Sequence, residues 1–233
     1  MLISWVNKFS LIEYPGEISC VIFTPGCNMR CKFCHNDEFV LPEKLKTVMN
    51  NLIPEEVFFN FLKDRKHALT GVSICGWEPT VQKDLIDFCR KIKSMWFKVK
   101  LDTNWRDSKI IKELIDEELV DYIAMDIKHI IPKIDDLVWI KIDKWEYLKT
   151  IEIIINSNIE HEFRTTVIKW VHDEESIEEM SKLIEWSNNY YLQNFRKEKT
   201  LDPNFKWLPF KSKELEKFKK IAEKYINNVW IRT

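Results

Sequence analysis

The sequence predicts an α/β fold, a partial (open) β/α barrel with about six parallel strands. Short apolar segments rich in β-branched and aromatic residues alternate with amphipathic segments along most of the chain. Repeated strand–helix units imply right-handed crossovers and therefore a parallel sheet. About six such units are too few to close an eight-stranded barrel, so the sheet is expected to stay open.

The expected strands are the short buried segments at residues 18–24, 72–75, 98–102, 122–127, 162–168 and 190–195. The expected helices lie between and after them, at residues 55–67, 81–95, 108–118, 146–156, 174–187 and 213–225. Pro54 suits the first turn of the first helix, and apolar residues recur with helical spacing through 81–95. Asp173 is placed to cap the helix that begins at residue 174.

The chain is expected to form one domain, residues 1–233, which ends in a loop from residue 194 and a helix. Its 36 basic and 37 acidic residues give a net charge of −1, which argues against a nucleic-acid binder that relies on phosphate contacts. No apolar run approaches the roughly 20 residues of a membrane span, and the N-terminus does not resemble a signal peptide. We therefore expect a cytoplasmic protein whose six cysteines are ligands or buried thiols.

The strongest motif is C-N-M-R-C-K-F-C at residues 27–34, in a predicted loop (25–36) that follows the first expected strand. Three thiolates in one short loop suit three irons of a cubane cluster, which leaves the fourth iron open to another ligand. An open position distinguishes a reactive metal site from a closed structural one.

The alternative is a structural zinc or cluster site, which usually needs a second pair of cysteines farther along the chain. The sequence has no second pair. His35 is adjacent to Cys34 and is sterically awkward as a fourth ligand. The remaining cysteines are isolated within apolar segments and are expected to be buried core thiols; these are Cys20, Cys75 and Cys89.

The C-x3-C-x2-C spacing, with Phe33 before the last cysteine, resembles the signature of the radical S-adenosylmethionine (SAM) superfamily. The resemblance implies a [4Fe–4S] cluster held by Cys27, Cys31 and Cys34, with S-adenosyl-L-methionine on the open iron. It implies reductive cleavage of SAM to methionine and a 5′-deoxyadenosyl radical that abstracts a hydrogen atom. The cofactors perform the difficult chemistry, so no further catalytic side chain is expected.

Three further strand ends resemble SAM-binding segments of that superfamily, and all are expected at the C-terminal mouth of the barrel. Residues 75–80 (C-G-W-E-P-T) resemble G-G-E-P-T, residues 101–104 (L-D-T-N) resemble L-D-T-N-G, and residues 124–128 (A-M-D-I-K) resemble M-D-I-K. A zwitterionic methionine group needs both an anionic and a cationic partner. The cofactor-binding residues implied are Phe33, Gly76, Trp77, Glu78, Pro79, Asp102, Thr103, Asp126, Lys128 and Arg164. A structural ion pair is an equal alternative for Arg164.

Segments 9–16, 161–167 and 192–196 narrow the resemblance to the activating proteins of anaerobic ribonucleoside-triphosphate reductases. These are glycyl-radical-enzyme activases related to the pyruvate formate-lyase activating enzyme. The implied reaction removes a hydrogen atom from one glycine Cα of a partner enzyme. The implied electron donor is a flavodoxin- or ferredoxin-like protein. Alternatives are activation of another glycyl radical enzyme, radical chemistry on a small molecule, or a non-catalytic iron–sulfur or zinc-binding interaction protein. Neither nucleic acid nor a membrane is an expected partner.

Tryptophan stands at several positions where these segments usually carry glycine. Trp77 replaces the second glycine of G-G-E-P, Trp105 follows the D-T-N strand end, and Trp96 precedes an expected strand. Trp170 and Trp230 also occupy places where glycine is the ordinary choice. An indole at residue 77 is expected to crowd the methionine group of SAM, because glycine at such points allows close approach of the backbone to a ligand.

Two explanations compete: loss of SAM binding, or UGA codons that the cell reads as glycine and a common alternative code renders as tryptophan. The chain has four glycines and ten tryptophans, whereas average usage predicts about 16 glycines. The sum of the two counts is close to that figure, which favours recoding. We therefore expect Trp77, Trp96 and Trp105 to be glycine in the native protein, and Trp186, on an expected helix face, to be a genuine tryptophan.

Overall fold

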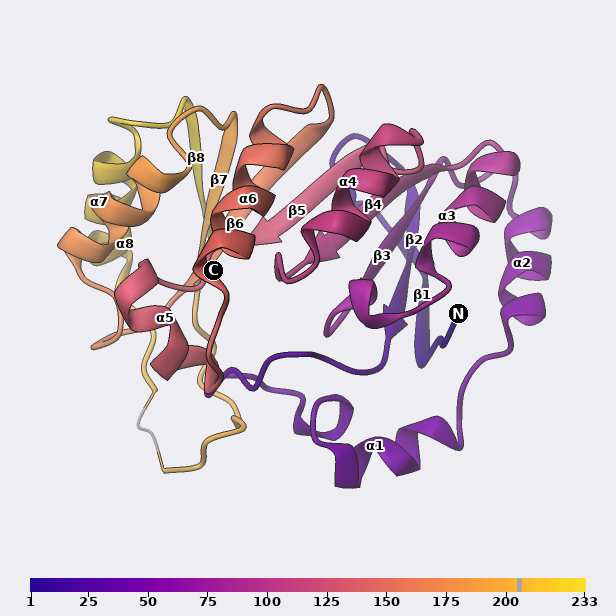
Figure 1. The fold of residues 1–233 in the computed structure, drawn as a ribbon, viewed down its shortest axis with the longest axis horizontal. Helices are drawn as coiled ribbons and strands as arrows, with labels where there is room; N and C mark the ends of the chain where they lie inside the picture. The colour runs from indigo at the N-terminus through magenta and orange to yellow at the C-terminus, as the bar shows by residue number, and fades with distance from the viewer. Residues whose placement is uncertain (205–206) are drawn as a thin grey trace. The chain divides into compact units, whose positions relative to one another are not determined.

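The computed structural model describes residues 1–204 and 207–233 (Figure 1). In this part of the chain eight strands form one sheet whose order follows the sequence, β1 to β8. The pairs β2–β3, β3–β4, β6–β7 and β7–β8 are parallel, and β1–β2 is antiparallel. The sheet is open, as predicted. The residues divide into two compact units, 1–28 with 37–123 and 29–36 with 124–233.

The first unit contains β1 (Trp5–Ser10), β2 (Ser19–Thr24), β3 (Gly71–Gly76), β4 (Lys98–Thr103) and the start of β5 (Tyr122–Asp126). Its helices are α1 (Pro42–Met49), α2 (Glu55–Asp64), α3 (Leu85–Ser94) and α4 (Ser108–Asp116), with short 3-10 turns η1 (Asp37–Phe39) and η2 (Pro79–Val81). Apolar strand residues such as Ile22, Ile74 and Leu101 are fully buried. The register places Thr24 opposite Gly76, so the carboxyl ends of β2 and β3 lie side by side.

The second unit contains the end of β5 together with β6 (Glu160–Val167), β7 (Asn189–Asn194) and β8 (Asn228–Arg232). Its helices are α5 (Ile131–Val138), α6 (Lys144–Ile155), α7 (Glu174–Leu183) and α8 (Ser212–Ala222). Helices α7 and α8 pack together, and α8 also contacts β7 and β8 (Figure 1). Phe163, Leu192 and Val229 bring apolar side chains from three strands into the core of this unit.

Aspartates fix the starts of several helices. The side chain of Asp107 accepts a hydrogen bond from the Ile110 N–H, and Asp143 accepts from Trp145 and Glu146. The predicted cap at Asp173 is confirmed, because its carboxylate accepts from the Ser176 N–H in a reciprocal capping box. These caps satisfy N–H groups that have no partner within the helix.

All six expected strands are present, within two residues at either end, but the sequence did not indicate β1, β8, α1 or α5. Most of β1 is exposed and it lies at the edge of the sheet, next to β2, so it lacks the buried apolar pattern of the other strands. Helix α1 has no buried residue at all. The expected helix 81–95 begins only at Leu85, because the chain first forms η2.

Helix α7 ends at Leu183, so the placement of Trp186 on a helix face is wrong; the residue lies in a turn and is 82% exposed. Cys20 and Cys89 are fully buried as expected, whereas Cys75 at the end of β3 is half-buried. Among the described residues no helix has the length and apolar character that crossing a membrane requires. That residues 1–233 act as one domain stays a prediction.

Candidate functional site

The site residues predicted from the sequence are divided between the two units. In the first unit they gather around the Glu78 carboxylate, which is 1% exposed. Its Oε1 accepts hydrogen bonds from the Thr80 N–H (3.1 Å) and hydroxyl (2.6 Å) and from the Thr103 hydroxyl (2.9 Å). Its Oε2 accepts from the Asn104 N–H at 2.6 Å. Glu78 therefore ties the segment after β3 to the end of β4.

Burial raises the pKa of Glu78, and the hydrogen bonds from Thr80, Asn104 and Thr103 oppose that rise. All four partners are donors, so the arrangement suits an ionised carboxylate. Backbone N–H and hydroxyl groups stabilise the negative charge of Glu78, and none of these four hydrogen bonds comes from a cation.

Gly76 is the one predicted residue whose backbone excludes any side chain. Its φ is +128°, and a Cβ there would lie 2.4 Å from the Thr24 carbonyl oxygen and 2.5 Å from the Thr24 nitrogen. The Trp77 N–H donates to the Thr24 oxygen (3.4 Å) and the Glu78 N–H to the Gly26 oxygen (3.1 Å). Residues 76–78 therefore lie directly against the end of β2, and only glycine allows that approach.

The Trp77 indole stacks on Phe39 of η1, with ring centres 3.8 Å apart and planes 7° apart. Pro79 is buried and is the first residue of η2. The indole is thus held against the segment that follows the cysteine loop.

Asn104 has a contact that the sequence did not suggest. Its side-chain amide donates to the Asn28 side-chain oxygen (2.8 Å) and points at the Cys27 sulfur, with Nδ2 and Sγ 3.7 Å apart. The Arg106 guanidinium donates to the Asn28 backbone oxygen. Hydrogen bonds to cysteine sulfurs tune the potential of iron–sulfur clusters. The D-T-N segment was the available signal, but the sequence alone gave its asparagine no role.

Lys100 was also missed. It is 1% exposed within β4, and its ammonium forms an ion pair with Asp102 and lies 6.0 Å from the centre of the Tyr122 ring. Asp102 and Thr103 are buried as well. A lysine at an interior position of an apolar strand is the signal that would have drawn attention to it.

In the second unit, hydrogen bonds hold the loop that carries Cys31 and Cys34 on both sides. The Lys32 N–H donates to the Leu137 oxygen at 3.0 Å, and the Leu201 N–H donates to the Cys34 oxygen at 2.8 Å. A turn closes between the two cysteines, because the Cys34 N–H donates to the Cys31 oxygen at 3.0 Å.

Phe33, between these two cysteines, is an anchor. Its side chain is 8% exposed and packs in an apolar cluster with four other buried residues: Leu137, Ile168, Phe195 and Trp207. The Trp207 ring meets the Phe33 ring edge-on, with centres 6.4 Å apart. The Cys31 side chain packs against the same cluster.

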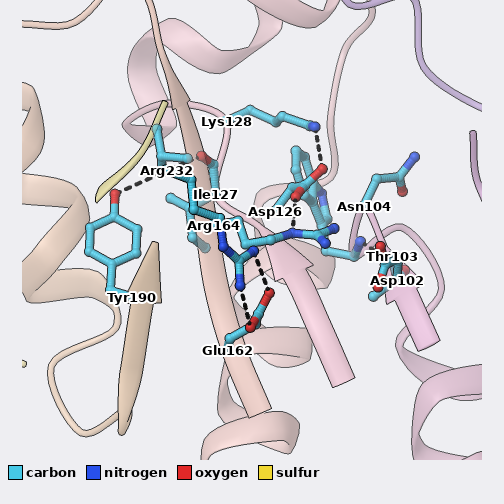
Figure 2. A network of polar contacts seen from close by, with 12 residues as sticks. Asp102, Thr103, Asn104, Asp126, Ile127, Lys128, Glu162, Arg164, Tyr190 and Arg232 are labelled. Carbon is cyan, nitrogen blue, oxygen red and sulfur yellow. Dashed lines mark hydrogen bonds and ion pairs between the residues drawn. The ribbon is translucent and has the colours of Figure 1, made fainter. Parts of the chain in front are cut away.

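Asp126, Lys128 and Arg164 form a three-residue charge network (Figure 2). The Asp126 carboxylate accepts from the Lys128 ammonium at 2.6 Å and from the Arg164 Nε at 3.0 Å. The Ile127 N–H donates to the Arg164 carbonyl oxygen at 2.7 Å, which fixes β5 against β6 at this level. One anion thus sits between two cations, and the network carries a net positive charge.

The Lys128 charge of this network acts on Cys31. Burial raises the pKa of the Cys31 thiol to about 11, and the Lys128 ammonium opposes the rise. Burial lowers the pKa of Lys128, but the Asp126 and Cys31 charges outweigh it and hold that pKa above its usual value. The cation therefore favours the thiolate, the form that binds metal.

The model for the radical SAM superfamily matches residues 21–187 of the chain, which spans both units. A protein of Methanocaldococcus jannaschii named "Putative glycyl-radical enzyme activating enzyme MJ1227" is 39% identical over 240 residues, covering 100% of this chain and 96% of the relative. The chain is a radical SAM enzyme of the glycyl-radical-enzyme activase family.

Other relatives agree with this assignment. The pyruvate formate-lyase-activating enzyme of Clostridium pasteurianum is 24% identical over 237 residues, covering 96% of each chain. A solved domain of the pyruvate-formate lyase-activating enzyme of Bacteroides vulgatus matches 70% of this chain and 99% of its own, at 16% identity and a TM-score of 0.59. SuiB of Streptococcus suis matches 91% of this chain and 49% of its own, at 17% identity and a TM-score of 0.69. These two structures share its fold.

Membership of the radical SAM superfamily implies a [4Fe–4S] cluster and SAM. The donor set of this radical SAM enzyme fits such a cluster: three of the six cysteine thiols lie within eight residues of loop. Among the described residues no group of three or more His, Cys, Asp or Glu side chains is already gathered as a metal site. The fit therefore rests on the chemistry of the thiols and on the Lys128 cation beside Cys31.

Proposed function

We propose that this activase installs a glycyl radical on an anaerobic ribonucleoside-triphosphate reductase. The full-length similarity to a relative named as a glycyl-radical enzyme activating enzyme carries the proposal at the level of the family. The resemblance of segments 9–16, 161–167 and 192–196 supports the choice of reductase as partner. We further propose a flavodoxin- or ferredoxin-like electron donor and a cytoplasmic location, where the cluster thiols stay reduced.

Within this proposal Cys27, Cys31 and Cys34 hold the cluster. When bound, the cluster supplies an electron for the cleavage of SAM, which in turn provides the radical that takes a hydrogen atom from the partner's glycine. The chain's own contribution is to position these groups and to exclude water. Asn104 supports this role for Cys27, because its amide points at that sulfur.

The charge network of Asp126, Lys128 and Arg164 is our candidate for recognition of the SAM methionine group. Its three side chains are 12–25% exposed, so a ligand can reach them, and they offer both charges that a zwitterion requires. We propose that Gly76, Trp77, Glu78, Pro79, Asp102, Thr103 and Phe33 belong to the cofactor-binding set as well. Within that set, the hydrogen bonds of Glu78 support a bracing role for its carboxylate.

The test is anaerobic reconstitution with iron and sulfide, reduction with SAM present, and detection of 5′-deoxyadenosine and of a glycyl radical by electron paramagnetic resonance. We expect a radical on an anaerobic reductase from the same genome. Cys27→Ala should lose both signals, whereas the matched control Cys89→Ala, a buried thiol on α3, should keep them. The chain should be assayed both with tryptophan at residues 77 and 105 and as the double variant Trp77→Gly/Trp105→Gly.

The second candidate is activation of another glycyl radical enzyme, favoured by the similarity to pyruvate formate-lyase-activating enzymes. A radical on pyruvate formate-lyase and none on the reductase would establish this candidate and overturn our choice of partner. SAM cleavage without a radical on either protein would overturn both. The absence of SAM cleavage in both forms of the chain would contradict a catalytic role.

A further inference from the structure

Four tryptophans of the chain have a backbone conformation that is unusual for any residue other than glycine. In residues 1–204 and 207–233, five residues other than glycine have positive φ, and four of them are tryptophan. These are Trp96 (φ 71°), Trp105 (φ 77°), Trp139 (φ 56°) and Trp170 (φ 67°), with Glu118 (φ 55°) as the fifth. Tryptophan accounts for ten of 233 residues, so five positions taken at random would contain less than one on average.

This conformation is one that bulky L-residues avoid, because their Cβ crowds the neighbouring carbonyl. Relative to glycine, the left-handed region is disfavoured for such a residue by about tenfold in population. When a residue other than glycine does adopt it, Asn and Asp are the usual choices. Four tryptophans at these positions therefore need a specific cause.

Two of the four end helices at the position that glycine dominates. Trp139 follows α5 with φ 56° and ψ 28°, in the left-handed conformation. Trp96 comes one residue after the C-cap of α3, and its N–H donates back to the Lys93 oxygen at 2.9 Å. A left-handed residue just after a helix is most often glycine, because it satisfies the last carbonyls at no steric cost.

The other two lie in turns. The Val171 N–H donates to the Ile168 oxygen at 3.1 Å, which closes a four-residue turn with Trp170 at its third position. A positive φ at that position calls for glycine. Trp105 follows the D-T-N end of β4, and its N–H donates to the Thr103 hydroxyl at 3.3 Å.

At three of the four positions the side chain does not explain the choice of tryptophan. Trp96 is 87% exposed, Trp170 67% and Trp139 52%, so most of the indole surface gains nothing from burial. Trp105 is fully buried, so at this residue the inference rests on the positive φ and on the place after the D-T-N strand end, whereas burial gives no support. Loss of function by mutation also gives no account of the pattern, because drift away from glycine would produce varied replacements.

We infer that residues 96, 105, 139 and 170 are glycine in the protein that the cell makes, encoded by UGA codons read as glycine. This inference rests on backbone geometry and is independent of the proposed function. It adds residue 139, which no motif had indicated. For Trp77 the φ is not positive, so glycine at that position stays a prediction from the sequence.

The geometry also identifies a genuine tryptophan. Trp207 is 5% exposed, and its ring lies 6.4 Å from Phe33 and 6.3 Å from Phe195, centre to centre. Replacing it by glycine would leave a large cavity beside the cysteine loop. We therefore expect a UGG codon and an intact indole at this residue.

The test combines the codons of the gene sequence with mass spectrometry of peptides from the protein purified from its native organism. We expect UGA at codons 96, 105, 139 and 170, and peptide masses that match glycine at these four residues. Peptides that contain residue 207 are the internal control and should match tryptophan. A UGG codon or a tryptophan mass at any of the four, or a glycine mass at residue 207, would overturn the inference.

Discussion

The two units differ in the surroundings of the acidic side chain at their strand ends. In the first unit the central acid, Glu78, is buried and accepts four hydrogen bonds from uncharged donors. In the second, Asp126 is 25% exposed and lies between the cations Lys128 and Arg164. A carboxylate with four protein donors has little capacity left for a ligand, whereas partly exposed ion pairs can be exchanged for ligand charges. The first acid is therefore suited to holding structure, and we propose that the second recognises a charged group.

The largest expected effect follows from removing the buried acceptor. Glu78→Gln presents an amide N–H₂ to donors at Thr80, Thr103 or Asn104, so some of them lose their acceptor. Hydrogen bonds to charged groups contribute about 1.5–3 kcal/mol each, and we expect the free energy of unfolding to fall by about 4 kcal/mol. Urea unfolding measures it.

A matched control for Glu78→Gln is Glu13→Gln, which changes an exposed carboxylate in the same unit. It should leave the unfolding free energy within about 0.5 kcal/mol. Equal losses in the two variants would contradict the bracing role of Glu78.

The next effect is expected at Lys100. Lys100→Met removes the ammonium that pairs with the buried Asp102 carboxylate, and breaking a buried pair costs about 3 kcal/mol. Lys98→Met, two residues earlier, removes an ammonium whose side chain is 57% exposed, and should cost less than about 1 kcal/mol. Double replacement, Lys100→Met with Asp102→Leu, should recover much of the stability. If it does not, Asp102 is not the partner that makes Lys100 necessary.

A third prediction concerns pH and the second unit. Burial lowers the pKa of His172 to about 3 and that of His129 to about 4. His172 Nδ1 accepts from the Ile168 N–H (3.0 Å) and its Nε2–H donates to the Lys128 oxygen (3.0 Å), an arrangement that requires the neutral ring. The ring thereby holds the backbone of Lys128.

Because both folded pKa values lie below the unfolded value of about 6.5, the unfolded chain binds more protons as pH falls. Their contribution to stability is complete above pH 6.5 and is lost as pH falls from there toward the folded values. Between pH 7.5 and 5.5 we expect a loss of about 3 kcal/mol for the pair, measured by urea unfolding. His172→Gln should remove about half of this dependence, whereas His67→Gln, at an exposed residue of the first unit, should leave it unchanged.

The charge network offers the sharpest contrast with Glu78. Asp126→Asn leaves Lys128 and Arg164 close together, and their side chains are only 13% and 12% exposed, so we expect a loss of about 2 kcal/mol in stability, between the values for surface and buried pairs. Affinity for SAM, measured by calorimetry on the reconstituted protein, should fall about tenfold or more. Asp136→Asn, at a side chain 88% exposed, is the control. Unchanged affinity in Asp126→Asn would place SAM recognition elsewhere.

The contrast between the two acids was not available from the sequence. Motif order and strand periodicity located Glu78 and Asp126 at strand ends, because parallel strands bring such residues to one edge. Periodicity carries no information about which donors surround a carboxylate, so Asn104 and Lys100 emerged only with the three-dimensional contacts. Helix α1 and strand β1 were missed for a related reason: mostly exposed elements leave no apolar pattern to detect.

The counts of glycine and tryptophan, by contrast, favoured recoding, and the structure shows which tryptophans have positive φ. The sequence marked Trp96 and Trp105 through their motifs, and Trp170 as a position where glycine is the ordinary choice. Trp139 follows α5, a helix that the sequence did not indicate, so no expected helix end drew attention to it. The sign of φ is a tertiary property, and it distinguishes Trp139 from Trp230, which lies in β8 without positive φ.

The smallest expected effects are two changes in the free energy of unfolding that have similar size and opposite sign. Trp96→Gly relieves a left-handed backbone at an exposed site and should raise the free energy of unfolding by about 1 kcal/mol. Trp230→Gly removes a ring that stacks on Tyr191 and puts glycine inside a strand, so it should lower stability by about 1 kcal/mol. Both indoles are at least half exposed, so burial alone predicts similar losses. Opposite signs would identify backbone conformation as the cause, and a loss in Trp96→Gly would remove the physical reason for glycine there.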